Sequence, residues 1–201
     1  ELSLETLSSP GLRIDEVHAD QIIANALEAT GDPSLGLTVG QQLNLGAHAV
    51  VGQSFLACAN LLEVMDTLVR YGPLLTGRQA QIDHYKDPEA SRIGLTLSLT
   101  SPSPSIRFSY EAVFSAAQKT LSDLLRTPAV DVEVSFPYDA PQDKTAFTEI
   151  FGNNVRFNAE RATLTIPGAL TKVHLPTSNP TLRALSVSYT HLRAHETLTD
   201  R

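Results

Sequence analysis

The side chains that could carry out chemistry are few, and none has the spacing of a known catalytic or metal-binding motif. Six histidines and one cysteine are present. His191 and His195 stand at the i, i+4 spacing that places two imidazoles on one helix face. One cysteine excludes a disulfide framework or a cysteine-based zinc finger within a single chain. The sequence also lacks a phosphate-binding glycine loop, an HExxH motif and a GxSxG motif. We therefore predict no metal site, no cofactor and no enzymatic activity.

Polar side chains also occur in a glycine-flanked stretch, LGAHAVVGQSF, at residues 45–55. His48 and Gln53 lie there. Polar groups that point into a pocket can recognise a small molecule by hydrogen bonds. Surface-facing or helix-capping roles are the alternative, and the residue types leave both open.

Two arginines are the remaining candidates. Arg107 and Glu111 are four residues apart at the start of a predicted long helix. The ordinary interpretation is a solvated ion pair, with the cation first, which is the less favourable order on a helix. Arg70 precedes Tyr71 where another predicted helix ends, and a cation at that position is favoured by the helix dipole.

The composition limits the function further. A chain of 201 residues is long enough for one domain or two small ones. Its net charge of −7 argues against a role as the main nucleic-acid-binding surface, since affinity for phosphates depends on Lys and Arg. No apolar run approaches the roughly 20 residues of a membrane span. The first residues lack a basic start and an apolar core, so we predict no signal peptide.

Periodicity predicts an α+β fold. Helical spacing of apolar residues indicates a helix over residues 18–30. Ser34 could cap a short helix through residue 43, and a stretch rich in small residues indicates a helix over 47–59. A further helix over residues 60–71 buries apolar side chains and ends at Gly72 and Pro73. Strict alternation predicts strands over residues 92–100 and 130–136. Three further strands and two further helices are also predicted. One predicted strand, residues 79–86, forms a hairpin with residues 92–100, and two more are residues 155–157 and 163–166. The helices are a long one over residues 105–126 and a short one over residues 143–151. We expect a helical N-terminal part packed on a small mixed or antiparallel sheet of about five strands, with one long helix.

The sequence of residues 31–75 resembles the N-terminal, arabinose-binding-like domain of AraC/XylS-type bacterial transcription regulators. That family typically reads GDP-x-LGL-x-x-G, then a glycine-rich segment, then a helix ending in Arg-Tyr. The positions that match are Gly31, Asp32, Pro33, Leu35, Gly36, Leu37, Gly40, Gly46, Gly52, Leu68, Arg70 and Tyr71. Later segments also match, at residues 132–141, 151–157 and 175–180. Ala49, Gln53 and Ala59 depart from the family pattern.

The resemblance implies an effector-sensing and dimerising domain over residues 1–186 of a cytoplasmic regulator. Its expected partners are a small-molecule effector and a second copy, as a homodimer. DNA binding would belong to a C-terminal helix-turn-helix domain that is absent here, and no membrane is involved. We predict a pocket lined by His48, Gln53 and Tyr71, with Arg107 as a partner for an anion. A ligand-free dimerisation module is the alternative function.

The last residues have a different character. Residues 187–197, VSYTHLRAHET, resemble the in-frame translation of a sequencing-library adapter. We therefore expect residues 187–201 to be a non-native tail, and His191 and His195 not to be ligands.

Overall fold

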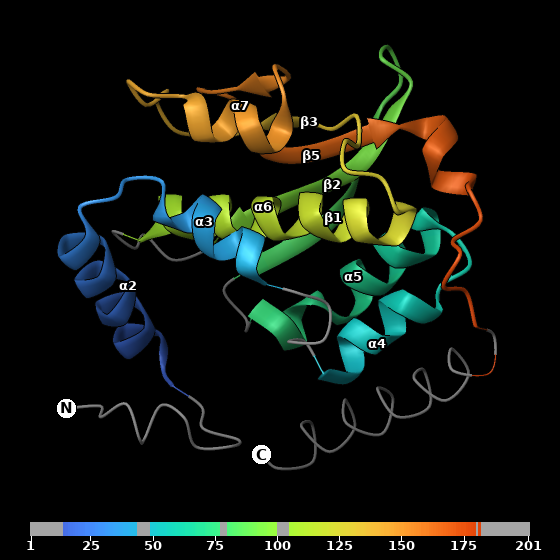
Figure 1. Ribbon diagram of the computed structural model, residues 1–201, viewed down its shortest axis with the longest axis horizontal. Coiled ribbons are helices and arrows are strands. Elements are labelled where there is room, and N and C mark those ends of the chain that lie inside the picture. Colours follow the sequence, from blue (N-terminus) through green and yellow to red (C-terminus); the bar gives the residue numbers. More distant parts are fainter. Residues whose placement is uncertain (1–13, 44–48, 77–79, 100–104, 180, 182–201) are drawn as a thin grey trace.

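A computed structural model describes residues 14–43, 49–76, 80–99, 105–179 and 181 (Figure 1). The fold is α+β, as predicted. The helices are α2 (Glu16–Thr30), α3 (Leu35–Gln42), α4 (Ala49–Ala57), α5 (Leu61–Thr76), α6 (Ile106–Leu125) and α7 (Thr145–Phe151), with a short 3-10 helix, η3 (Gly168–Lys172). Among these residues, no helix is long and apolar enough to cross a bilayer.

The five strands form one mixed sheet in the order β1-β2-β5-β3-β4. The strands are β1 (Ala80–Asp87), β2 (Arg92–Leu99), β3 (Glu133–Ser135), β4 (Val155–Arg156) and β5 (Ala162–Pro167). The predicted hairpin is confirmed, because β1 and β2 pair antiparallel with Asp87 opposite Arg92. β3 is shorter than predicted, and it pairs parallel with β4 and antiparallel with β5. The sheet therefore joins strands that lie far apart in the sequence.

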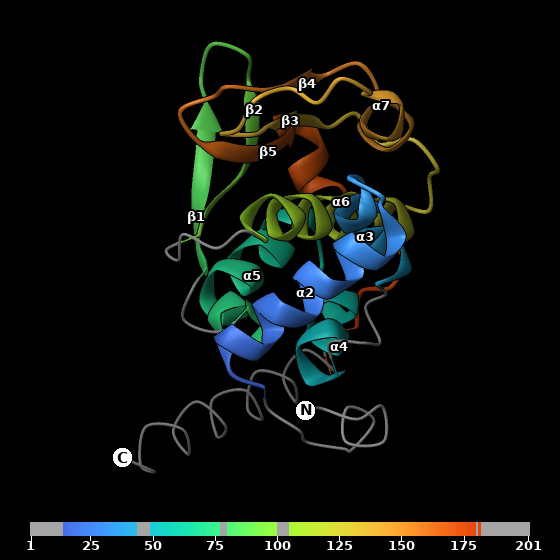
Figure 2. The same cartoon turned by 90° about the vertical axis from the view of Figure 1, so that its left-hand side faces the viewer.

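The long helix α6 occupies the centre of the molecule. Figures 1 and 2 show α7, β3 and β4 on one side of α6, and α4 and α5 on the other. The helix α3 packs alongside α6, and α5 packs against β1. Since α6 contacts elements from both halves of the chain, its buried residues connect the N-terminal helices to the sheet.

Local signals explain both ends of α2 and the start of α5. α2 begins at Asp15, whose carboxylate accepts a hydrogen bond from the His18 backbone N–H, and it ends at Gly31 with a φ of 61°. At the start of α5, the Asn60 side chain accepts from the Glu63 N–H at 3.0 Å. The Glu63 carboxylate in turn accepts from the Ala59 N–H at 2.8 Å. This reciprocal arrangement is close to a capping box, with the second bond made to Ala59 instead of Asn60.

The predicted end of α5 is wrong, because the helix continues through Pro73 to Thr76. A proline removes one backbone hydrogen bond from a helix, which tertiary packing can offset. That packing is present at Tyr71 and Gly72, which are buried. A Cβ at Gly72 would lie 2.8 Å from Cδ1 of Ile82 in β1. The sheet thus holds this part of the helix in place.

An aromatic cluster fills the space between β3, α6 and α7. Phe136 is fully buried at its centre. Its ring contacts those of Phe114, Tyr138, Phe147, Phe151 and Phe157, with centroid distances of 5.1–6.2 Å. Because Tyr138 belongs to this cluster, the loop between β3 and α7 is fixed above α6.

The segment after η3 returns to the junction of α4 and α5. His174 forms an isolated antiparallel bridge with Asn60. The Leu175 N–H donates to the Ala59 carbonyl at 2.8 Å, and the Leu175 side chain is fully buried. This segment is therefore anchored to the N-terminal helices by backbone hydrogen bonds and by one apolar side chain.

Candidate functional site

A fully buried carboxylate, Glu111, lies in the second turn of α6. Its Oε1 accepts two hydrogen bonds, from Arg107 Nε at 2.6 Å and from the Tyr138 hydroxyl at 3.0 Å. Its Oε2 is also buried and has no hydrogen-bond partner. An unmatched buried polar atom costs about 1–3 kcal/mol, and such atoms are uncommon in native proteins. The free oxygen therefore marks Glu111 as a candidate for binding.

The surroundings of Glu111 oppose its ionisation. Burial raises the pKa of Glu111, and the negative charge of Asp32 acts in the same direction. The hydrogen bond and positive charge of Arg107 lower the pKa, as does the hydrogen bond from Tyr138. Burial also raises the pKa of Tyr138, with a further contribution from the Glu111 charge. Tyr138 consequently stays protonated and donates to Glu111 at any physiological pH.

Arg107 links the buried carboxylate to the surface. Its side chain is 34% exposed, whereas that of Glu111 is 1% exposed. The guanidinium carbon lies 5.4 Å from the centroid of the Tyr138 ring, over its face. One terminal nitrogen, Nη2, is buried and has no hydrogen-bond partner. The guanidinium and the carboxylate are thus joined by one hydrogen bond, and each group keeps one buried polar atom without a partner.

The helix α3 positions Glu111 through two glycines. A Cβ at Gly36 would lie 2.6 Å from the Phe108 carbonyl oxygen and 2.9 Å from the Glu111 Cβ. A Cβ at Gly40 would lie 2.5 Å from the Ala112 carbonyl oxygen. Only glycine allows two helix backbones to approach so closely.

Ser115, one turn beyond Glu111, joins the same two helices by hydrogen bonds. Its hydroxyl donates to the Leu37 carbonyl at 2.7 Å, and Gln41 Nε2 donates to the Ser115 carbonyl at 2.9 Å. These bonds fix the rotation of α6 that turns Glu111 inward.

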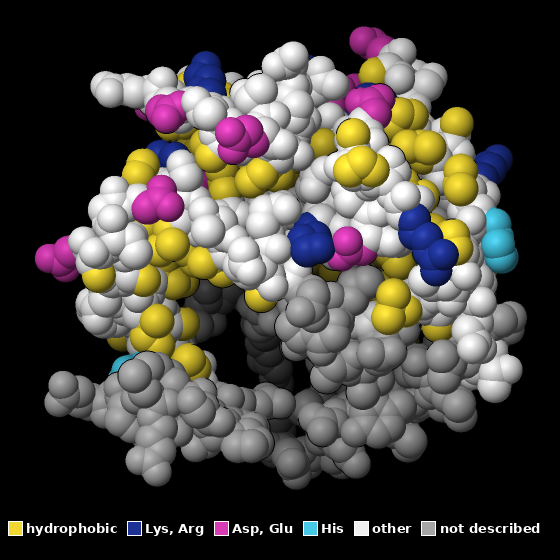
Figure 3. All heavy atoms as spheres, in the orientation of Figure 1, with side chains coloured by type: hydrophobic (Ala, Val, Ile, Leu, Met, Phe, Trp, Pro, Cys, Tyr) yellow, Lys and Arg dark blue, Asp and Glu magenta, His cyan; other side chains and the backbone are white. Residues whose placement is uncertain are grey.

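The outer surface near α6 is hollowed. Figure 3 shows hydrophobic side chains along a recess between α7 above and the α3–α6 pair below. The partly buried Tyr138 and Phe157 pack against the aromatic core on the same side of α6.

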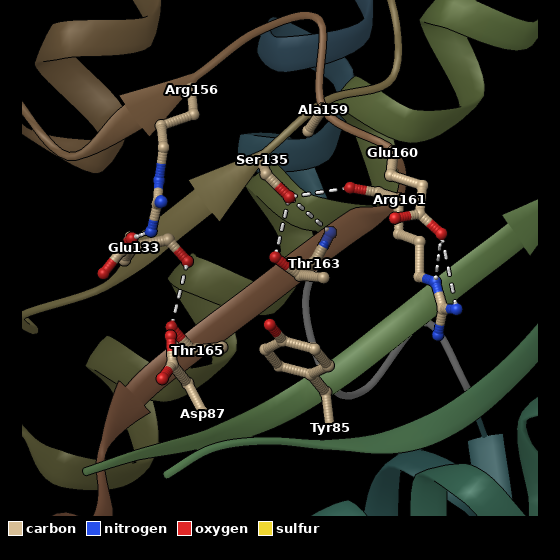
Figure 4. Close-up of a pocket in the computed structure, with 10 residues that line it drawn as sticks. All are labelled: Tyr85, Asp87, Glu133, Ser135, Arg156, Ala159, Glu160, Arg161, Thr163 and Thr165. Atoms are coloured by element: carbon tan, nitrogen blue, oxygen red, sulfur yellow. Dashed lines mark hydrogen bonds and ion pairs between the residues drawn. The ribbon is translucent and has the colours of Figure 1, made fainter. Parts of the chain in front are cut away.

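A second hollow, of about 320 Å³, opens on the face of the sheet (Figure 4). Its lining is mostly polar and charged and comes from β1, β3, β4 and β5 and the turn between β4 and β5. Most of these groups are already paired with each other. Ser135 and Thr163 share a hydrogen bond of 2.7 Å, Arg156 pairs with Glu133, and Arg161 pairs with Glu160. Because its polar atoms are largely satisfied, this groove is the weaker candidate for binding.

No metal centre is found in the part of the chain that the structure describes. No three or more histidine, cysteine, aspartate or glutamate side chains gather there in a way that could hold an ion. Cys58 is buried, and its thiol lies 3.2 Å from the Ser54 carbonyl oxygen. His191 and His195 lie outside the described residues.

Comparison with known proteins identifies the family. Residues 1–175 match the model of the arabinose-binding domain found at the N-terminus of AraC transcription regulators. The chain belongs to this AraC N-terminal domain family. An ornithine utilization regulator from Pseudomonas aeruginosa is 27% identical over 176 residues, or 88% of this chain and 51% of the relative. The chain thus spans about half the length of that relative.

A solved structure shares the fold. The crystal structure of the transcriptional regulator CdpR from Pseudomonas aeruginosa matches with a TM-score of 0.66 and 17% identity. The match covers 89% of this chain and 63% of the CdpR chain. The arrangement of helices around one mixed sheet is therefore shared by a regulator of very different sequence.

The AraC-type motif GDPSLGLTVG contributes directly to the candidate site. Asp32 provides the negative charge that acts on Glu111, and Gly36 lies against the Glu111 Cβ. The Asp32 side chain also accepts from the Ser34 N–H at 2.7 Å, which orders the turn before α3. The motif that carried the resemblance therefore shapes the surroundings of the buried carboxylate.

The four residues predicted to line a pocket have different outcomes. Arg107 lies at the Glu111 site. Tyr71 is buried in α5, where its hydroxyl has no hydrogen-bond partner. The backbone of Gln53 lies in α4, while its side chain and the whole of His48 lie outside the described residues.

Two residues of the site were not predicted. The interpretation of Arg107 and Glu111 as a solvated pair is wrong, because Glu111 is fully buried. The sequence contained one usable signal, since Glu111 lies three residues from both Phe108 and Phe114 on the helix. Tyr138 had no such signal, because it is 27 residues away from Glu111 in sequence.

Proposed function

We propose that this chain is the part of an AraC-type regulator that senses a small-molecule effector and forms a homodimer. The observation that carries the proposal is the match of residues 1–175 to the N-terminal domain of such regulators. Because the chain spans about half of a relative, we assign DNA binding to a further domain of the whole protein. We assign the whole regulator to the bacterial cytoplasm, where its operator DNA would lie.

The buried polar cluster supports effector binding. Glu111 Oε2 and Arg107 Nη2 are unused, and both belong to side chains that are otherwise well anchored. A ligand that supplies the missing partners gains hydrogen bonds in a site shielded from water. The apolar recess beside α6 adds surface for the rest of such a ligand (Figure 3).

The segment after η3 offers a route from the sensor to a following domain. Its backbone is hydrogen-bonded to Ala59, at the junction of α4 and α5. A ligand that shifts α4 or α5 would therefore also shift this segment. Coupling of this kind requires that the ligand prefers one of two arrangements.

The sequence-predicted pocket remains part of the proposal. We assign His48, Gln53 and Tyr71 to ligand contact together with Arg107. The unpartnered Tyr71 hydroxyl supports its assignment. We assign no catalytic role to any residue, and the domain acts by binding.

The test has two independent parts. Light scattering over a dilution series measures the mass, and we expect a dimer that dissociates only on dilution. A thermal-shift screen of amines, carboxylates, amino acids and sugars measures ligand stabilisation, which rises with ligand concentration. Because one relative is named for ornithine utilization, L-ornithine belongs in the library.

Three variants locate the pocket. His48→Ala and Gln53→Ala are expected to reduce the ligand-induced shift, whereas Thr38→Ala, at an exposed position of α3, is expected to leave it unchanged. An unchanged shift in both of the first two variants removes them from the pocket. A dimer that no compound stabilises would favour the ligand-free interaction module instead.

A further inference from the structure

The groups around Glu111 carry an excess of negative charge. Asp32 and Glu111 are both carboxylates, and Arg107 is the cation that acts on Glu111 among the described residues. The nearby Lys144 ammonium lies over the Phe157 ring at 5.6 Å. The cluster therefore lacks a positive charge when Glu111 is ionised.

The unpartnered oxygen of Glu111, Oε2, needs a hydrogen-bond donor. Oε1 already accepts two hydrogen bonds, while Oε2 accepts none and is buried. An ionised carboxylate is an acceptor at both oxygens, so Oε2 needs a donor. A positively charged donor makes the stronger bond and also corrects the charge balance.

Arg107 does not donate a hydrogen bond to Oε2 itself. Its bond to Glu111 runs from Nε to Oε1, although a parallel second bond is common for arginine–carboxylate pairs. Its guanidinium is held over the Tyr138 ring. With a side chain that is one-third exposed, Arg107 forms the side of the cluster that faces solvent.

We propose that the Glu111 carboxylate, held by Arg107 and Tyr138, binds the ammonium group of a small cationic ligand at Oε2. This inference rests on the proposed effector-sensing function and names the chemical class of the effector. An ammonium group carries three donors on a compact charge, which suits a single free oxygen. An anionic ligand could use Arg107 Nη2 but would be repelled by Asp32 and Glu111.

The chemical class is tested with three probes that share one four-carbon chain: 1,4-diaminobutane, 1,4-butanediol and succinate. Binding is followed by NMR on the full chain, using the Arg107 Nε–H and the Glu111 carboxyl carbon as reporters. We expect the diamine to shift both signals in a saturable way, and the diol and succinate to leave the Glu111 signal in place. Equal or stronger binding of the diol or succinate overturns the proposal.

Two variants assign the binding to Glu111. Glu111→Gln keeps the shape and removes the charge, so diamine affinity should fall by about tenfold or more. Asp123→Asn is the matched control, because Asp123 pairs with Lys119 at the same i, i+4 spacing on the same helix, with its carboxylate exposed. It should leave diamine affinity unchanged. Diamine affinity that is retained in Glu111→Gln overturns the proposal.

Two readouts keep the test decisive. If Glu111→Gln fails to fold, the wild-type carboxyl signal still reports contact, and Asp32→Asn should weaken diamine binding by roughly threefold through the lost charge. Dimerisation and the wider thermal-shift screen are measured separately. An effector that binds equally well without the Glu111 charge would contradict this inference and leave the proposed sensing function intact.

Discussion

Gly36 of α3 lies against Glu111 of α6, so closely that a Cβ on Gly36 would lie 2.9 Å from the Glu111 Cβ. The contact joins the motif that identifies the family to the one fully buried carboxylate among the described residues. Any change in the packing of α3 on α6 would therefore alter the surroundings of Glu111.

The first prediction concerns this contact. Gly36→Ala should lower the free energy of unfolding by about 1–3 kcal/mol, because the new methyl group would overlap the Phe108 carbonyl and Glu111. Alanine also has a higher helix propensity than glycine, by about 1 kcal/mol, and this gain offsets part of the loss from the overlap. Urea denaturation measures the effect, with the exposed Thr38→Ala as the control. A stabilised Gly36→Ala would contradict the close packing.

A second prediction concerns pH. The raised pKa of Glu111 means that the folded chain holds this proton more tightly than the unfolded chain does. Folded stability should therefore fall as pH rises from the ordinary glutamate pKa, about 4.3, through the raised value. Glu111→Gln removes this loss, so the wild-type melting temperature should decline relative to that of the variant across this range. Parallel melting curves at all pH values would disprove the assignment.

Tyr138 gives a third prediction. Tyr138→Phe removes the hydroxyl that donates to Glu111 Oε1 at 3.0 Å and leaves the ring in the aromatic cluster. We expect a loss of about 1–2 kcal/mol in the free energy of unfolding, since a buried carboxylate loses one hydrogen bond. Urea denaturation measures it, and Tyr85→Phe, in the groove of the sheet, is the matched control. Equal losses in the two variants would argue against a special role for Tyr138.

The fourth prediction addresses the segment after η3. Leu175→Ala should cost about 2–5 kcal/mol, because the side chain is fully buried. Val173→Ala, two residues earlier and 43% exposed, should have almost no effect. Thermal or urea denaturation compares them. Similar stabilities would show that the segment is not anchored as the structure indicates.

The fifth prediction follows from the adapter-like tail. We propose that residues 187–201 contribute nothing to folding, so a chain that stops at residue 186 should melt within about 1 °C of the full chain. Differential scanning fluorimetry makes the comparison. A marked loss of stability on truncation would assign the tail a structural role.

The sequence by itself determined the elements and the family. Apolar spacing located α2 and α6, and strict alternation located β2, because these patterns report local periodicity. The order of short motifs around Gly36 pointed to the AraC-type domain, which the family match confirms. Pro73 was misread as a helix end, because the burial of its neighbours against β1 is not visible in local sequence.

The tertiary structure alone decided the site. The i, i+4 spacing of Arg107 and Glu111 predicted their contact, but spacing on one helix does not say which face is covered. Burial of Glu111 depends on Gly36, from an earlier helix, and on Tyr138, from a later loop. Tyr71 and Arg107 lie on the separate helices α5 and α6, and sequence patterns do not encode how these two helices pack. The periodicity of apolar residues depends only on neighbours in the sequence, whereas the charge and solvation of a carboxylate depend on the segments that pack over it in the fold.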